Sequence, residues 1–182
     1  MKSALAQSPD EVFDIVDDRD CVIGQGFRGE IHRQGLKHRA VHLFWWRPDG
    51  QMGWQRRSYA KDNCPGMISS ACAGHVDAGE SYLAAAYREL FEELGIKLNA
   101  GELTEIDYVA AHEDLGREFV RCYIFKGEYP LQLATAEVEA VLWRTPLEME
   151  AWTQRQPEIF STPLLYLLKQ PKVRQALGLP LR

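Results

Sequence analysis

Three glutamates lie close together in the middle of the chain, at positions 89, 92 and 93. The surrounding residues predict a helix over Ser81–Leu94, because its first residue suits an N-cap and the glycine that follows it suits a helix end. At 3.6 residues per turn, Glu89, Glu92 and Glu93 share one face of that helix. Carboxylates so placed repel by about 0.2–0.5 kcal/mol per pair, whereas Mg²⁺ would bind them together. A solvated acidic helix face is the alternative for the three glutamates alone.

The charge is unevenly distributed along the 182 residues, whose net charge is −5. The segment Gly74–Ile96 carries −4 of it, and the segment Arg28–Lys61 carries +6. A basic segment followed by an acidic one is compatible with an anionic ligand that is held through a cation, although both could be solvated faces. The mildly acidic total argues against a nucleic-acid polymer as partner.

The composition is that of an average globular protein, with 46% hydrophobic and 26% charged residues. It excludes disordered, collagen-like and membrane-bundle chains, and no apolar run approaches the roughly 20 residues of a membrane span. The N-terminus lacks a signal-peptide pattern, and the four cysteines form no CxxC pair. We therefore expect one domain over residues 1–182, reduced thiols, a cytoplasmic location, no membrane partner and about ten flexible N-terminal residues.

Strand and helix patterns alternate without regularity along the chain, which predicts an α+β fold. Strands are predicted over Val12–Val16, Arg39–Arg47, Gln51–Ser58, Met67–Ala73, Glu105–Ala111, Glu118–Phe125 and Val138–Trp143. Further helices are predicted over Arg28–Gln34, Pro146–Gln154 and Pro163–Gln170, with Pro171 ending or kinking the last one. Pro48-Asp49-Gly50 predicts a turn that makes a hairpin of the strands beside it.

The glutamate cluster belongs to a longer pattern. Residues 74–96 read GHVDAGESYLAAAYRELFEELGI, which is a glycine, five residues, a glutamate, seven residues and then RELxEExGI. This resembles the Nudix box, GX5EX7REUXEEXGU with U aliphatic, at all nine specified positions. Other segments, among them GLKHRAV, QRRSYAK and EVEAVLW, are similar to the branch of Nudix proteins related to isopentenyl-diphosphate isomerase. The resemblance covers nearly the whole chain.

The resemblance implies a fold and an activity. The fold would be the Nudix α/β/α sandwich, with a mixed β-sheet between helices and the box as a loop–helix–loop. The reaction would be attack by water on a diphosphate linked to another group, in a small-molecule substrate and with Mg²⁺ or Mn²⁺. Nudix proteins are often dimers, so a homodimer stays open.

The resemblance also implies roles for single residues of the box. The metal ligands would be Glu89, Glu92, Glu93, the carbonyl of Gly74, and Glu80. Arg88 would hold the glutamates in place by ion pairing. The proton of the attacking water would go to Glu92 or Glu93, or to a carboxylate outside the box. The candidates outside the box are Glu118, Glu137 and Glu139, and each could instead be a surface carboxylate.

The isomerase branch suggests a second activity. Isopentenyl-diphosphate isomerases use a cysteine, a tyrosine and a glutamate, and they hold a metal through histidines and glutamates. His75 follows the box glycine as in those enzymes, and His32 and His38 resemble their N-terminal histidine pair with a spacing one residue shorter. Tyr108 and Glu118 lie in roughly the corresponding regions. His75 and His38 are therefore candidates for lining the site. Arg56, Arg57 and Lys61 precede the box and could reach a phosphate, with simple solvation as the alternative.

One substitution favours hydrolysis over isomerisation. The reactive cysteine of the isomerases directly precedes the box glycine, and this chain has Ala73 there. Cys72 is one residue too early, and on a strand a shift of one residue points the side chain to the other face. A third alternative is a nucleotide-binding module without catalysis, but such modules commonly lose box carboxylates and this chain keeps them all.

Overall fold

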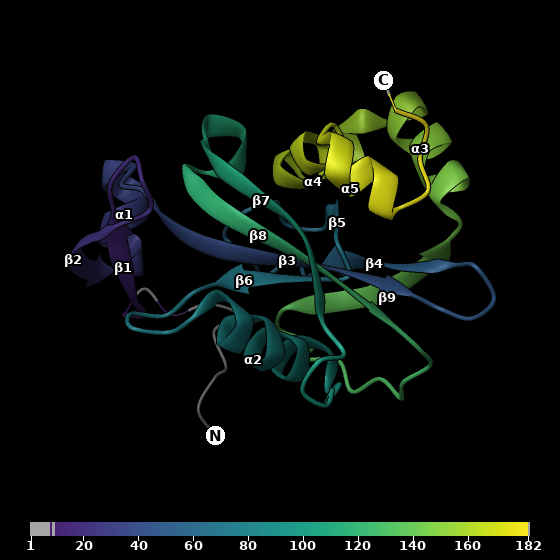
Figure 1. Ribbon diagram of the computed structural model, residues 1–182, viewed down its shortest axis with the longest axis horizontal. Helices are drawn as coiled ribbons and strands as arrows, with labels where there is room; N and C mark the ends of the chain where they lie inside the picture. Colours follow the sequence, from purple (N-terminus) through teal and green to yellow (C-terminus); the bar gives the residue numbers. More distant parts are fainter. Residues whose placement is uncertain (1–7, 9, 182) are drawn as a thin grey trace.

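A seven-stranded mixed sheet runs through the middle of the molecule (Figure 1). The computed structural model describes residues 8 and 10–181, so most of the N-terminal segment that the sequence predicts to be flexible lies outside the described residues. The strands of the sheet are β3 (His38–Trp46), β4 (Met52–Arg57), β5 (Ile68–Ser69), β6 (Cys72–His75), β7 (Thr104–His112), β8 (Glu118–Lys126) and β9 (Val138–Arg144). Because β3 and β8 pair in parallel and the other pairs are antiparallel, the sheet is mixed, as the resemblance to Nudix proteins implies.

The two strands of the predicted hairpin around Pro48-Asp49-Gly50 pair only next to the turn. β3 and β4 pair at two positions, Trp45↔Gly53 and Trp46↔Met52. The strands then diverge, and β6 takes the place of β4 beside the first half of β3, from Ala40↔His75 to Leu43↔Cys72. The predicted strand Met67–Ala73 is correspondingly divided into β5 and β6. This divergence opens the space in which the site lies.

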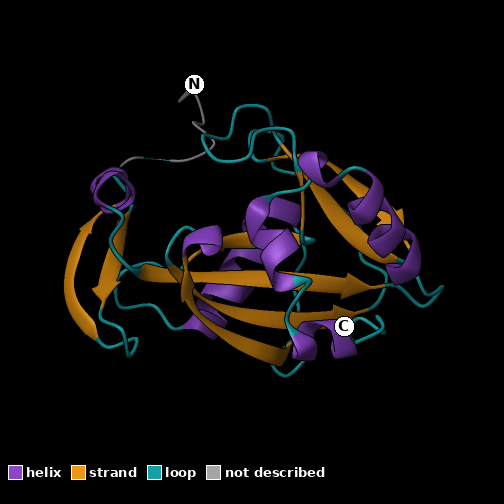
Figure 2. Ribbon diagram, turned by 90° about the horizontal axis from the view of Figure 1, so that it is seen from above, coloured by secondary structure: helices purple, strands orange, loops and turns teal. Residues whose placement is uncertain are grey.

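A separate two-stranded hairpin stands off one end of the large sheet (Figure 2). It consists of β1 (Val12–Val16) and β2 (Val22–Phe27), followed by α1 (Arg28–Gln34). Asp20, in the turn of the hairpin, fastens it to the sheet. Its carboxylate accepts hydrogen bonds from Arg39, Tyr82 and Tyr108 at 2.6–3.1 Å.

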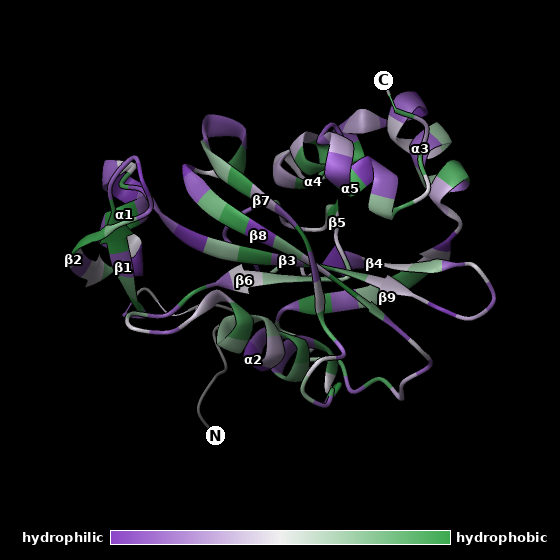
Figure 3. Ribbon diagram, viewed as in Figure 1, coloured by the Kyte–Doolittle hydropathy of each residue, from purple (hydrophilic) through white to green (hydrophobic). Residues whose placement is uncertain are grey.

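Helices cover both faces of the sheet, which makes the α/β/α sandwich (Figure 1). On one face lies α2 (Tyr82–Leu94), and on the other lie α3 (Pro146–Arg155), α4 (Thr162–Leu167) and α5 (Pro171–Ala176). Two short 3₁₀ turns, Glu113–Leu115 and Pro157–Ile159, complete the described elements. Each face has its own apolar core, because side chains alternate along the strands: Val41 and Leu43 pack toward α2, whereas Ala40 and Phe44 pack toward the C-terminal helices. Figure 3 shows that apolar residues, interrupted by polar ones, follow one another along β3 and β8.

The predicted helix Ser81–Leu94 is confirmed, together with both of its ends. The Ser81 hydroxyl accepts a hydrogen bond from the Ala84 amide, and Gly95 adopts the left-handed conformation at φ 72° that suits glycine. Pro171 does more than end the preceding helix, because it is the first residue of α5, where its missing N–H costs no helical hydrogen bond. Within the described residues, no helix is long and apolar enough to cross a bilayer.

Candidate active site

A cavity of about 610 Å³ opens where β4 leaves β3. Its walls come from β3, β4, β6 and α2, from the 3₁₀ turn before β8 and from the start of α4. The site residues expected from the sequence that line it are Arg57, Gly74, His75, Arg88, Glu89, Glu92, Glu118 and Glu137. Three further candidates, Glu80, His38 and Glu93, contact residues of the cavity lining. Glu80 accepts a hydrogen bond from Arg88, His38 lies beside Glu118, and Glu93 lies beside Lys61, which also lines the cavity.

The Arg88 guanidinium organises the box. Its Nε and Nη2 donate to the two carboxylate oxygens of Glu80 at 3.0 and 2.8 Å, and Nη1 donates to Glu89 at 2.8 Å and Glu92 at 3.1 Å. Nη2 also donates to the carbonyl of His75 at 2.9 Å, which ties α2 to β6. Arg88 therefore fixes the helix, the strand and the carboxylates relative to one another. Both carboxylate oxygens of Glu80 are engaged in hydrogen bonds from Arg88 in this arrangement.

Gly74 makes room for a carboxylate. A Cβ atom built on Gly74 would lie closer than 3.0 Å to the carboxylate carbon and both oxygens of Glu89. No other residue type could occupy this position without moving Glu89. The first glycine of the box is therefore required by the close approach of the β6 backbone to a glutamate of α2.

The two oxygens of Glu93 have different surroundings, although its side chain is fully buried. Oε2 accepts hydrogen bonds from the Gln55 side-chain amide at 2.7 Å and from the Ala73 backbone amide at 3.3 Å. Oε1 accepts none from the described residues. Buried polar atoms are rarely left without a hydrogen bond, and the Lys61 ammonium faces this oxygen only at 3.7 Å, so Oε1 fits a metal cation as a closer partner.

Burial changes the protonation of two box glutamates. Removal from water, followed by the nearby Glu93, raises the pKa of Glu89 to about 8, and the ion pair with Arg88 only partly opposes this. Burial likewise raises the pKa of Glu93, although Lys61 opposes the change. Two buried carboxylates side by side are the arrangement that a divalent cation stabilises.

The raised pKa of Glu89 predicts how stability depends on pH. In the folded state Glu89 keeps its proton up to about pH 8, whereas in the unfolded state it releases the proton at a lower pH. Stability therefore falls as the pH rises toward about 8. We expect this contribution to lower the melting temperature of the protein in EDTA as the pH rises toward 8, and the comparison with Glu89→Gln separates it from the contributions of other titrating groups. The slope should be smaller in Glu89→Gln, and an identical slope in that variant would contradict the assignment.

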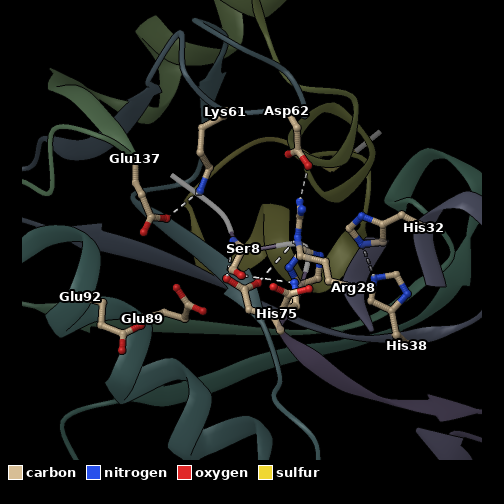
Figure 4. A network of polar contacts seen from close by, with 12 residues as sticks. Ser8, Arg28, His32, His38, Lys61, Asp62, His75, Glu89, Glu92 and Glu137 are labelled. Carbon is tan, nitrogen blue, oxygen red and sulfur yellow. Dashed lines mark hydrogen bonds and ion pairs between the residues drawn. The ribbon is translucent and has the colours of Figure 1, made fainter. Parts of the chain in front are cut away.

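Lys61 and Glu137 face the box carboxylates from the other side of the cavity (Figure 4). The Lys61 ammonium lies 2.8 Å from Glu137 Oε2 and 3.7 Å from Glu93 Oε1. Arg57 lines the same wall, and its Nε donates to the Asn63 carbonyl at 3.0 Å. Of the two candidate arginines, Arg57 thus reaches the cavity, whereas Arg56 lies on β4 at the residue before a register shift.

Three histidines and a glutamate form a second cluster beside the box. His32, His38, His75 and Glu118 each offer a ligand atom, and these atoms all lie within 4.8 Å of one another. Burial lowers the pKa of His32 to about 4 and also lowers that of His75, which favours the neutral imidazoles that bind metals. Burial alone would raise the pKa of Glu118, but hydrogen bonds from His38 and His75 hold it well below its usual range. The cluster fits a divalent transition-metal ion.

Two residues that isomerisation would use do not line the cavity. The Cys72 thiol is fully buried in the core beneath α2, next to Glu93. Burial and this carboxylate raise its pKa well above the ordinary value, so it is a poor nucleophile. The Tyr108 hydroxyl donates to Asp20 in the turn of the β1–β2 hairpin. Of the neighbours Cys72 and Ala73, it is Ala73, directly before the box glycine, that lines the cavity.

Comparison with known proteins agrees with this arrangement. The model of the NUDIX domain matches residues 36–162, which include the whole box and most of the sheet. The chain belongs to the NUDIX domain family. An isopentenyl-diphosphate Delta-isomerase of Serratia proteamaculans is 32% identical over 162 residues, covering 88% of this chain and 90% of the relative. An uncharacterized Nudix hydrolase of Nostoc is 34% identical over 146 residues, covering 80% and 86%.

Solved structures share the NUDIX fold. A crystal structure of a Deinococcus radiodurans protein superposes with a TM-score of 0.70 at 25% identity, covering 80% of this chain and 90% of that one. The NUDIX domain of Shewanella oneidensis NrtR, solved with ADP ribose, gives a TM-score of 0.57 at 17% identity and covers 76% and 86%. The second likeness concerns the fold alone.

One residue of this NUDIX site has no local sequence signal, and for another the sequence leaves two interpretations open. Gln55 is an amide in a strand, and it contacts Glu93 from 38 positions away. The sequence allows Lys61 to be a phosphate contact or a solvated residue, and the structure places it in the cavity with only 3% of its side chain exposed. Their charge and hydrogen-bonding capacity become informative once β4 is known to lie beside the box helix.

Proposed function

We propose that the protein is a divalent-metal-dependent pyrophosphohydrolase that cleaves the diphosphate linkage of a small molecule. The observation that carries the proposal is that Gly74, Glu89 and Glu92 line one cavity, while the nearby Glu93 Oε1 has no hydrogen-bond donor among the described residues. Mg²⁺ or Mn²⁺ would be held by these carboxylates and would offset the negative charge that develops on phosphoryl oxygens during transfer. The named hydrolases among the relatives support the same reaction class.

The protein side chains divide the remaining tasks. Arg88 holds Glu89 and Glu92 in position, and Arg57 offers a cation to phosphate oxygens from the opposite wall. Glu137 lines the cavity across from the box and is our candidate for accepting the proton of the attacking water. Glu118 is less suited to that task, because its low pKa and its histidine contacts make it a weak base and a ligand of the second cluster.

The substrate class and the reaction can be tested together. A panel of nucleoside diphosphates and triphosphates, nucleotide sugars and isoprenoid diphosphates would be incubated with Mg²⁺ or Mn²⁺ and scored for phosphate, pyrophosphate and nucleoside monophosphate. Metal-dependent release of any of these supports hydrolysis. Tight nucleotide binding without turnover at any metal would contradict it and favour a non-catalytic binding module.

Isomerisation of an isoprenoid diphosphate is the second candidate. The histidine cluster and the relative named as an isomerase favour it, whereas the buried Cys72 and the remote Tyr108 do not. Proton exchange at carbon without phosphate release would identify this activity. Its loss in a Cys72→Ser variant would show that the buried thiol takes part after all.

Substitutions of the two candidate bases, Glu137 and Glu118, are expected to have different effects. Glu137→Gln should lower kcat by about 10²–10⁴, the usual contribution of a general base, while the number of metal ions bound at the histidine cluster stays the same. Glu118→Gln should instead weaken Zn²⁺ or Mn²⁺ binding at that cluster, measured by metal analysis after dialysis. Equal turnover in Glu137→Gln and the wild type would remove Glu137 as the base.

A further inference from the structure

We propose that Lys61 is a built-in counter-cation of the box carboxylates, which a divalent cation must displace in order to bind. This inference rests on the proposed function, because it takes the box glutamates as the metal ligands. It concerns a lysine inside the cavity and the loop 58–67 that carries it between β4 and β5.

The burial of Lys61 requires an explanation. Lysine is among the residues least often buried without a partner, and here 3% of the side chain is exposed. Its ammonium lies 2.8 Å from one oxygen of Glu137 and 3.7 Å from Glu93 Oε1. A buried charge is tolerated when opposite charges compensate it. Lys61 and the two glutamates therefore stabilise one another in the metal-free protein.

The oxygen that Lys61 faces is the one suited to a metal. Glu93 Oε2 is committed to Gln55 and Ala73, whereas Oε1 has no hydrogen-bond donor among the described residues. A divalent cation bound to Oε1 would lie close to the ammonium, and like charges repel strongly away from bulk water. The ammonium and the cation therefore compete for the same carboxylate.

The loop can release the ammonium without unfolding. Its backbone is held by a hydrogen bond from the Ser58 amide to the Glu137 carbonyl at 2.9 Å, and Asp62 pairs with Arg28 at 2.7 Å. Neither contact involves the Lys61 side chain, which has a flexible four-carbon stem. After withdrawal the ammonium would stay on the cavity wall with Arg57, where it could contact substrate phosphates.

The test is the affinity for Mg²⁺ alone, measured by titration calorimetry without substrate. Mg²⁺ is the probe because it prefers oxygen ligands and therefore reports the box rather than the histidine cluster. We expect Lys61→Met to bind Mg²⁺ at least tenfold more tightly than the wild type. Lys61→Arg, which keeps the charge, should resemble the wild type. Lys126→Met removes the same charge from an exposed position and is the control.

Each outcome decides the inference. Equal or weaker binding by Lys61→Met than by the wild type would overturn it, because a merely structural lysine would support the site rather than compete with the metal. If Lys61→Met unfolds in EDTA, Mg²⁺ should restore its folding more strongly than it stabilises the wild type, and failure to do so would also overturn it. Absence of Mg²⁺ binding in the wild type and in Lys61→Met would refute the proposed metal dependence itself, and with it this inference.

Discussion

Glu93→Gln is expected to abolish turnover while leaving the protein no less stable than the wild type at pH 8. We expect kcat to fall at least about 10³-fold, because a catalytic cation contributes several kcal/mol to the transition state and each factor of ten in rate corresponds to about 1.4 kcal/mol. The glutamine side chain keeps one oxygen, which accepts the Gln55 hydrogen bond. Its NH2 group takes the place of Oε1 and is a poor metal ligand.

The expected stability of Glu93→Gln follows from the direction in which burial shifts the pKa of Glu93. Burial raises the pKa of Glu93, so ionising it in the folded state costs free energy that a neutral glutamine does not. Removing the charge also relieves its repulsion of Glu89. Lys61 loses one partner but keeps Glu137 at 2.8 Å. These effects lead us to expect a melting temperature in EDTA equal to or above that of the wild type.

Activity and stability are measured on the same variant preparations. Turnover would be followed with the best substrate of the diphosphate panel, and melting with and without Mg²⁺. Glu139→Gln is the matched control, because it makes the same change of charge. Glu139, a candidate base from the sequence, does not line the cavity and lies at an exposed position of β9. An active Glu93→Gln would show that Glu93 is not a metal ligand, and a variant that melts below the wild type would show that its charge is structurally required.

The sequence predicts the parts of this molecule that depend on neighbouring residues. The box helix follows from Ser81, the three alanines at 84–86 and Gly95, all of which act within one segment, and its ends were predicted to within a residue. The face to which Cys72 points also follows from the period of a strand. What the sequence does not contain is how far paired strands stay together.

The contacts that complete the site depend on that long-range geometry. β3 and β4 separate after two pairs, which places Gln55 and Lys61 against Glu93. The same is true of the histidine cluster, where His32 comes from α1, His38 from β3 and Glu118 from β8. The types of these residues suggest metal binding. Because the cluster combines the His32–His38 segment with His75 and Glu118, the tertiary fold is what brings the four side chains within 4.8 Å.

Gly74→Ala is expected to damage the site through a single methyl group. The added Cβ would lie closer than 3.0 Å to the Glu89 carboxylate, so either Glu89 or the β6 backbone must move. Displacement of a catalytic group by about 1 Å can cost about 10²-fold in rate, and we expect at least that loss in kcat. Weaker Mg²⁺ binding and a lower melting temperature should accompany it, because Arg88 joins Glu89 to the β6 carbonyl of His75.

The control separates this clash from the general cost of replacing glycine. Gly24→Ala makes the same change in β2, where the nearest atom to the new Cβ would be Ile15 Cδ1 at 3.9 Å, and it should leave turnover and Mg²⁺ binding unchanged. Shortening the opposing side chain supplies a second check. In the double variant Gly74→Ala with Glu89→Asp, the shorter side chain draws the carboxylate back toward α2, so part of the lost melting temperature should return. If Glu89→Asp instead lowers the melting temperature by the same amount in the Gly74→Ala background as in the wild type, the two positions are independent and the clash does not explain the glycine.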